Sequence, residues 1–327
     1  IVLNVNTYVP GIEASSRTAP STENITSITA LAFDSDTTLI KVTKPTLNRD
    51  TSNGADKSLK GTMTLTVPQR TRFIHFIAKN NAEFTEITNS DLGKTARGLL
   101  VGRISKITNN SDAASISNAL HYWGMLTFAS AEELKQKKDV TLYRNMAKLS
   151  LHLPDGTDGH IAGILNYNTT GTMVPYIVKN GVTQFVYQTE TNHALPPTFE
   201  ITSDVTADKN LGTVHYLFEE YDDVGDLIYV ICKVGSKYYK IALVKPEFTD
   251  ISNKYYYVIR NMEYKINITG TLDEQLGKDD YSEAVKSGKP INDTAIEQVH
   301  LDFEPEEVTM YIGEPGTVTA SIPEGIT

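Results

Sequence analysis

Residues 61–80 read GTMTLTVPQRTRFIHFIAKN, two strand patterns separated by a proline. In the first pattern, Met63 and Leu65 alternate with polar residues, as in a strand with one buried face, and Pro68 ends it. The second pattern, residues 72–79, is apolar on both faces, which is typical of a central strand. The stretch therefore predicts a β-sheet protein with a two-layer core.

Strand patterns of the same kind recur at roughly ten-residue spacing through most of the chain. Two hairpins are expected, one over residues 28–42 around Asp34-Ser35-Asp36 and one over residues 227–244 around Gly235-Ser236. Short helices are expected within residues 81–98 and at residues 131–138. This spacing favours an all-β fold of antiparallel β-sandwiches with a few short helices.

Two interruptions of the strand pattern indicate changes of direction. The alternation over residues 140–153 changes parity near Asn145, which predicts a bulge or bend. Residues 179–198 contain Asn180-Gly181 and Pro196-Pro197 and are the expected domain boundary. We therefore expect an N-terminal domain over residues 1–178 and a C-terminal domain over residues 179–327, with a strand extension at about 300–327.

The composition excludes several classes of protein. Among 327 residues there are 17 Tyr, which favours strands, and the net charge of −10 argues against nucleic-acid binding and against electrostatic docking on anionic membranes. The single cysteine, Cys232, excludes an internal disulfide framework and a cysteine zinc site, and a role as a small buried hydrophobe is expected. The chain begins with Ile1 rather than Met, so a mature or trimmed form is expected, and the pattern at Thr327 suggests that the protein continues.

The sequence shows no motif for enzyme chemistry. Seven histidines are scattered without metal-ligand spacing, and nucleophile-elbow, phosphate-loop and dinucleotide motifs are absent. We therefore expect a protein that is not an enzyme and that binds no cofactor.

Two groups of residues permit a binding function as well as a structural one. One is a group of acidic residues near residue 220, which is expected to be a solvated turn, with a calcium site as the alternative. His121-Tyr122-Trp123 could stack on a sugar, but structural packing of the only Trp is favoured. The acidic group comprises Glu219, Glu220, Asp222, Asp223 and Asp226.

The first seventeen residues combine a strand with a cleavable tether. The strand pattern is apolar at alternate positions, and Arg17 stands in the polar stretch that follows it. Such a strand could be replaced by one from another molecule, because backbone hydrogen bonds supply affinity and alternate side chains supply register. We expect cutting to release an edge strand. Its apolar positions are Ile1, Leu3, Val5 and Val9.

Four segments in order resemble the type V pilins, the FimA-type fimbrillin family. They are residues 23–33 (ENITSITALAF), 61–80, 142–151 (LYRNMAKLSL) and 258–270 (VIRNMEYKINITG). The resemblance covers about residues 20–270.

The resemblance implies two tandem transthyretin-like Greek-key β-sandwich domains. It also implies export as a lipoprotein to the outer membrane, and cleavage by a trypsin-like, Arg-specific protease at Arg17. The first strand would then be displaced, and a strand from another pilin subunit would take its place in a growing fimbrium.

The C-terminal segment departs from the family pattern. Residues 299–303 lack the expected Trp, and two further alternating segments follow. A tip or accessory pilin is therefore considered beside a stalk subunit. Candidate donor strands are residues 308–312, which are preferred, and residues 318–322. The apolar donor positions are Val308, Met310, Ile312, Val318 and Ile322.

The leading interpretation is thus a structural pilus subunit that contributes to cell-surface adhesion, with a host or bacterial surface ligand as a further partner. The alternative is a non-polymerising surface lipoprotein that binds glycans or proteins through β-sandwiches.

Overall fold

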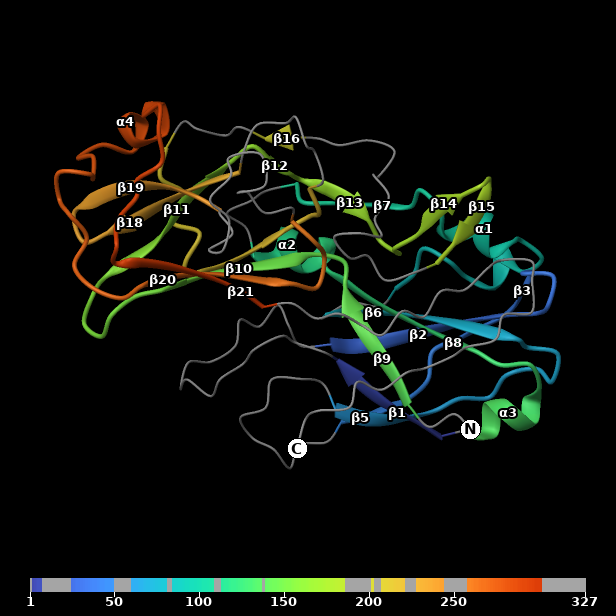
Figure 1. Cartoon of the computed structure of the whole chain (residues 1–327). Coiled ribbons are helices and arrows are strands. Elements are labelled where there is room, and N and C mark those ends of the chain that lie inside the picture. Colours follow the sequence, from blue (N-terminus) through green and yellow to red (C-terminus); the bar gives the residue numbers. More distant parts are fainter. Residues whose placement is uncertain are drawn as a thin grey trace.

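The computed structural model describes residues 2–7, 25–49, 60–80, 84–108, 113–136, 139–185, 201–202, 207–220, 228–243 and 258–301. These residues form two lobes that lie side by side (Figure 1). Strands β1–β9 build most of the N-terminal lobe, and β10, β11 and β17–β21 build the C-terminal lobe.

The N-terminal lobe is built on an eight-stranded sheet with the order β3-β2-β6-β8-β9-β1-β5-β4. Its strands are β1 (Val2–Thr7), β2 (Ile25–Phe33), β3 (Leu39–Thr43), β4 (Leu47–Arg49), β5 (Lys60–Thr64), β6 (Phe73–Asn80), β8 (His121–Thr127) and β9 (Asp139–Arg144).

Short strands and helices accompany the large sheets of both lobes. β7 pairs with β13, β12 with β16, and β14 with β15, each antiparallel. These strands are β7 (Ile104–Lys106), β12 (Tyr167–Asn168), β13 (Thr170–Thr172), β14 (Ile177–Lys179), β15 (Val182–Gln184) and β16 (Ile201–Thr202). The helices are η2 (Asn89–Asp91), α1 (Ala96–Leu100), α2 (Ala113–Ala119) and α3 (Ala131–Gln136).

The central strands of this sheet are buried on both faces, which confirms the interpretation of residues 72–79. On β6, Phe76 packs into one hydrophobic cluster and its neighbour Ile77 into another. The first cluster also takes Met63 from β5 and Leu142 from β9. Strands from both halves of the sheet therefore contribute to the same core.

The C-terminal lobe consists of two sheets that enclose a second core. A four-stranded sheet has the order β17-β10-β20-β21, and a three-stranded sheet has the order β11-β18-β19. The helix α4 packs through Tyr281 and Ala284 against the three-stranded sheet. The elements are β10 (Ala147–His152), β11 (Gly159–Leu165), β17 (Val214–Leu217), β18 (Tyr229–Val234), β19 (Lys237–Ala242), β20 (Glu263–Ile268), α4 (Tyr281–Lys286) and β21 (Ile296–Leu301).

Both expected hairpins are confirmed. β2 and β3 are joined by a turn in which the Asp34 carboxylate accepts the backbone N–H groups of Asp36 and Thr38 at 3.1 and 3.0 Å. β18 and β19 pair directly across Gly235-Ser236, where Gly235 has a φ of +59°. Turn chemistry therefore determined these connections as the sequence pattern indicated.

The parity change at Asn145 marks the crossing from one lobe to the other. β9 ends at Arg144, and β10 begins at Ala147 in the other sheet (Figure 1). Residues 173–185 return to the N-terminal lobe, where Met173 and Phe185 pack into its core. The hydrophobic clusters thus change at residues 146–147, and the expected domain boundary at residues 178–179 stays a prediction.

The all-β class with a few short helices is confirmed, whereas the tandem transthyretin-like Greek-key description stays a prediction. The sheets are not wholly antiparallel, because β1 pairs in parallel with β9 and β10 pairs in parallel with β20. Parallel pairs need long crossovers, and most of the N-terminal lobe separates β1 from β9 in sequence.

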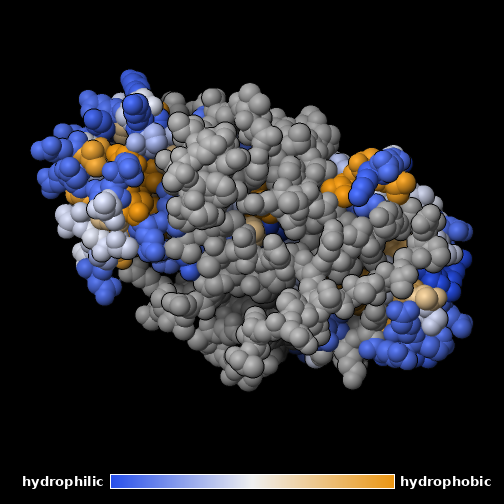
Figure 2. Space-filling view, in the orientation of Figure 1, coloured by the Kyte–Doolittle hydropathy of each residue, from blue (hydrophilic) through white to orange (hydrophobic). Residues whose placement is uncertain are grey.

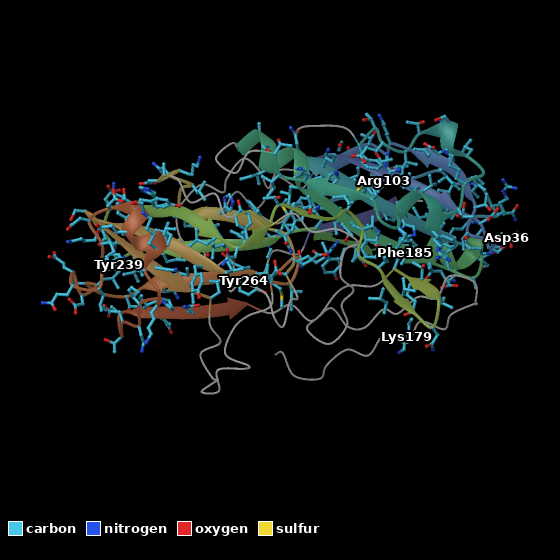
Figure 3. The ribbon with its side chains drawn as sticks, turned by 90° about the horizontal axis from the view of Figure 1, so that it is seen from above. Asp36, Arg103, Lys179, Phe185, Tyr239 and Tyr264 are labelled. Carbon is cyan, nitrogen blue, oxygen red and sulfur yellow. The ribbon has the colours of Figure 1, made fainter. Side chains whose placement is uncertain are left out.

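Polar and apolar side chains are unevenly distributed on the face of the molecule drawn in Figure 2. Figure 2 shows hydrophilic side chains at both ends of the molecule and an apolar patch at the β14–β15 hairpin, where Val178 is 55% exposed. Seen from above in Figure 3, Lys179 lies at the tip of this hairpin and Phe185 at its base.

Candidate functional site

The candidate site is the position that β1 occupies within the eight-stranded sheet. β1 pairs with β5 along five aligned residues, from Val2↔Thr64 to Asn6↔Lys60, and with β9 along four, from Asn4↔Asp139 to Thr7↔Leu142. The expectation of an edge strand is therefore wrong. The first strand lies inside the sheet because β9, far later in the sequence, supplies a second partner.

The register aligns β1 with residues of the N-terminal core. Leu3 is opposite Met63, and Val5 lies between Gly61 and Val140. Met63 and Val140 are both buried in the first hydrophobic cluster of the N-terminal lobe. The backbone register thus places positions 3 and 5 beside core residues of the neighbouring strands.

The place of β1 determines what its removal would leave. β9 would lose its partner on one side, and the β4–β5 pair would be separated from the rest of the sheet. Both new edges would present unpaired backbone groups on either side of one gap, which is the arrangement that favours addition of another strand.

A close approach of β9 to β8 shapes the wall of this site. β9 pairs with β8 only at Tyr122↔Arg144 and Trp123↔Tyr143, and then diverges to pair with β1. Gly124 follows the last paired residue of β8, and a Cβ atom there would collide with the backbone carbonyl of Thr141 on β9. Sequence reasoning missed this residue, although a glycine within a strand pattern is a signal for close backbone approach.

The other predicted strand-exchange residues lie outside the described residues. Of the first strand, Leu3 and Val5 are placed in β1, but Ile1, Val9 and the cleavage residue Arg17 are not described. All five donor-strand positions (Val308, Met310, Ile312, Val318 and Ile322) also lie outside them.

Two of the four family-like segments meet at the junction of the lobes. The backbone N–H of Arg144 donates to Asn261 Oδ1 at 3.1 Å, although 117 residues separate them. Nearby, Glu263 accepts from Ser150 Oγ at 2.9 Å and lies 3.6 Å from Lys148 Nζ. The separate motifs at residues 142–151 and 258–270 are thus one structural unit.

The structural interpretation of the aromatic tripeptide is supported by burial. Trp123 is 2% exposed and Tyr122 is 1% exposed, so neither ring offers a face to a sugar. His121 is also buried, and its Nδ1 lies 3.1 Å from Ser105 Oγ. The platform that would have supported glycan binding is therefore not present at these residues.

Glu219, the first residue of the acidic group, is part of a buried ion pair and not of a solvated turn. Glu219 is fully buried and accepts a hydrogen bond from the Arg260 guanidinium, which also donates to Thr172 Oγ1 at 2.6 Å. Burial raises the pKa of the Glu219 carboxyl, although Arg260 opposes that shift. Asp222, Asp223 and Asp226 lie outside the described residues. Within the described ranges, His, Cys, Asp and Glu form no group of three that could hold a metal ion.

Cys232 has the expected buried position on β18. Burial raises the pKa of its thiol to about 12, so the thiol is unreactive at neutral pH. In the part of the chain that the structure describes, no helix is long and apolar enough to cross a membrane.

Comparison with known proteins gives structural but no sequence matches. No protein-family profile and no curated protein matches this chain. The C-terminally truncated tip fimbrial protein Mfa3 of Porphyromonas gingivalis is 15% identical, with a TM-score of 0.51 over 93% of this chain and 100% of that one. A fimbrial assembly protein of Parabacteroides distasonis is 13% identical, with a TM-score of 0.44 over 82% of this chain and 90% of that one. These two solved structures are of fimbrial proteins, and the chain shares its fold with the tip fimbrial protein.

Proposed function

We propose that this chain is a structural pilus subunit, of the tip or accessory kind, that assembles by protease-triggered donor-strand exchange and contributes to cell-surface adhesion. One observation carries the proposal: β1 is an N-terminal strand held between β5 and β9, and it is joined to β2 through the segment that contains Arg17. The fold shared with a tip fimbrial protein supports it.

Cleavage after Arg17 would leave β1 attached only by non-covalent contacts. Each apolar strand residue that is buried contributes about 1.5–3 kcal/mol, so exchange of one apolar strand for another can be nearly neutral in free energy. Loss of the covalent link would make the exchange irreversible, because the displaced segment diffuses away.

The register gives a criterion for the incoming strand. Val5 is opposite Gly61, which has no side chain to fill space at that position. A replacement with Val308, Met310 and Ile312 at positions 3, 5 and 7 would place Met310 opposite Gly61, whereas the segment of residues 318–322 would place Ala320 there. The larger side chain favours residues 308–312 of a second copy as the donor.

The proposed partners are other pilin subunits, a trypsin-like Arg-specific protease and a ligand on a host or bacterial surface. The proposed location is the fimbrium at the outer membrane, reached as an exported lipoprotein. The alternative of a non-polymerising binding protein relied on an aromatic platform, and the buried Trp123 cannot provide one.

The test is limited proteolysis of the whole chain with trypsin and with an Arg-specific protease, followed by intact mass and by SDS gels of unheated samples. We expect one rapid cut after Arg17, a stable core and SDS-resistant ladders. Arg17→Ala should abolish the cut, while Arg17→Lys should be cut by trypsin but not by the Arg-specific protease.

The outcomes separate the interpretations. In one outcome the protein is cut after Arg17 and forms no ladders by itself. If ladders then appear after mixing with a second fimbrial subunit, an accessory position is supported. If Arg17 resists cutting while other loops are nicked, β1 is a permanent strand and the exchange mechanism is wrong.

A further inference from the structure

The tripeptide Arg-Asn-Met occurs twice in the chain, as residues 144–146 and 260–262. Each copy directly precedes a strand, β10 after the first and β20 after the second. These two strands are parallel neighbours at the centre of the four-stranded sheet, with Lys148 aligned to Glu263. The two copies are therefore brought together where the C-terminal lobe begins.

The two tripeptides bind each other through reciprocal backbone contacts. Arg144 N–H donates to Asn261 Oδ1 at 3.1 Å, and Asn261 N–H donates back to the Met146 carbonyl at 2.9 Å. Lys148 N–H donates to the Met262 carbonyl at 2.8 Å and continues the pairing into the strands. Arg144 and Asn261 are 0% and 5% exposed, so water does not compete effectively for these bonds.

The asparagine of the first copy is attached to the N-terminal lobe. Asn145 Oδ1 accepts from His121 N–H at 2.8 Å, and its Nδ2 donates to the Ala119 carbonyl at 3.1 Å. The Asn145 backbone N–H also donates to the His121 carbonyl at 2.9 Å. One tripeptide thus connects the start of β8 with β9, and the other connects β9 with β20.

The arginines extend the junction to two further elements. The Arg144 guanidinium lies over the ring of Tyr216 on β17, 5.7 Å from its centroid. The Arg260 guanidinium donates to Glu219, just beyond β17, and to Thr172 on β13. We refer to residues 144–146 and 260–262 with these contacts as the paired-tripeptide junction.

The junction lies on the direct route between the β1 site and the C-terminal strand. β9 pairs with β1, and the chain continues from β9 through residues 145 and 146 into β10 (Figure 1). β10 pairs with β20, and β20 pairs with β21 through six aligned residues ending at Leu301. The route from the β1 site to the end of β21 therefore crosses only one connection outside a strand ladder, at residues 145–146.

We propose that the paired-tripeptide junction is a force-bearing clamp that passes tension from the β1 site to β21. This function rests on the proposed strand exchange, in which a neighbouring subunit would pull on the strand that replaces β1. Without the clamp, tension on β9 would load the two-residue link alone and could separate the lobes. With it, the load is shared by β8, β20 and β17, because their bonds to residues 144–146 and 260–262 must break together.

The test is single-molecule pulling on the full chain between engineered cysteines at two exposed positions, Asp139 at the start of β9 and Glu297 on β21. The native Cys232 is buried and does not compete for the handles. Asn261→Gly removes the side-chain acceptor and suits the φ of +65° at that position. Asn180→Gly is the matched control, because Asn180 has a φ of +52° at an exposed hairpin tip.

We expect Asn261→Gly to raise the unfolding rate at constant force about tenfold over Asn180→Gly, the effect of losing about one buried hydrogen bond. Equal rates for the two variants would overturn the clamp. If Asn261→Gly does not fold, amide hydrogen exchange of the parent protein tests the clamp instead. The amides of Arg144, Lys148 and Asn261 should then exchange only through global unfolding, and exchange as fast as in the β14–β15 hairpin would overturn the proposal.

Pulling on the uncleaved monomer does not depend on assembly. A mechanically strong junction in a protein that forms no ladders after cleavage at Arg17 would refute strand exchange, and with it the load-bearing role in a fimbrium. Ladder formation with equal pulling rates would refute the clamp and leave strand exchange intact.

Discussion

Trp123 Nε1 donates a hydrogen bond to His75 Nδ1 at 3.0 Å in the core of the N-terminal lobe. The acceptor role requires His75 to be neutral at Nδ1, and burial lowers the pKa of this imidazole to about 3. The only tryptophan of the chain is therefore paired with a histidine that stays uncharged at neutral pH.

Acidification should destabilise the protein through His75 and two other buried histidines. Burial lowers the pKa of His121 and of His215 to about 4. Since an unfolded histidine has a pKa of about 6.5, the unfolded state binds more protons below that pH, and stability falls as pH falls towards 4. Each histidine should cost about 1.4 kcal/mol per pH unit below 6.5.

The measurement is the free energy of unfolding by urea between pH 7.5 and 5. His75→Asn keeps an acceptor for Trp123 but does not titrate. The slope of its unfolding free energy against pH should therefore be smaller by the contribution of one proton. An unchanged slope in this variant would show that His75 is not the source of the acid sensitivity.

The single tryptophan also tests the alternative function. Because Trp123 is 2% exposed, we expect blue-shifted emission that acrylamide quenches poorly. Glycans should leave the emission unchanged. A shift of the emission with a glycan, together with easy quenching, would return the binding-protein interpretation to the lead.

Substitution in the first strand should reveal whether β1 is seated on the core. Val5 is aligned with Gly61 and with the buried Val140, so we expect Val5→Asp to bring a carboxylate beside the core at a cost of several kcal/mol. Asn6→Asp is the control, since it adds the same charge at the alternate position, opposite Lys60. Thermal melting of both variants is the measurement, and equal melting would remove the support for an exchangeable strand.

Gly124→Ala should disturb the same site from the other side. The added methyl group would collide with the carbonyl of Thr141 on β9, so β9 must move away from β8. We expect destabilisation of about 1–3 kcal/mol and faster hydrogen exchange in β1 and β9. Gly181→Ala is a useful comparison, because its Cβ would meet no neighbour and only its φ of +79° is unfavourable. Protection of β9 amides that matches the parent protein would contradict the close-approach argument.

The buried Glu219–Arg260 pair should behave as a structural pair and not as a metal ligand. Glu219→Gln leaves Arg260 without its charged partner, with an expected loss of about 3–5 kcal/mol. The double variant Glu219→Leu, Arg260→Met should recover much of this loss, because no unpaired charge remains. EDTA should change the melting temperature of none of these proteins, and a fall in the parent alone would revive the calcium interpretation.

The local sequence pattern was sufficient to predict where strands lie but not which strands pair with each other. The burial of Met63 and Leu65 and the two-sided burial of residues 72–79 followed from the side chains alone, because each strand exposes its faces with a period of two. The end of the first strand did not, because β5 ends at Thr64 and not at Pro68. The hairpins around Asp34 and Gly235 followed from turn chemistry. The parity change at Asn145 was visible as well, but its meaning, a crossing between lobes, was not.

By itself, the sequence determined the all-β class, the strand at the N-terminus and the lack of catalytic motifs, since these depend on residue type and short-range period. Tertiary structure decided that β1 lies inside its sheet beside β9 and that residues 144–146 contact residues 260–262. It also decided the burial of Trp123. The physical reason is that strand neighbours are selected by how whole faces pack across more than a hundred residues, and hydrogen-bond register carries no local signature of its partner.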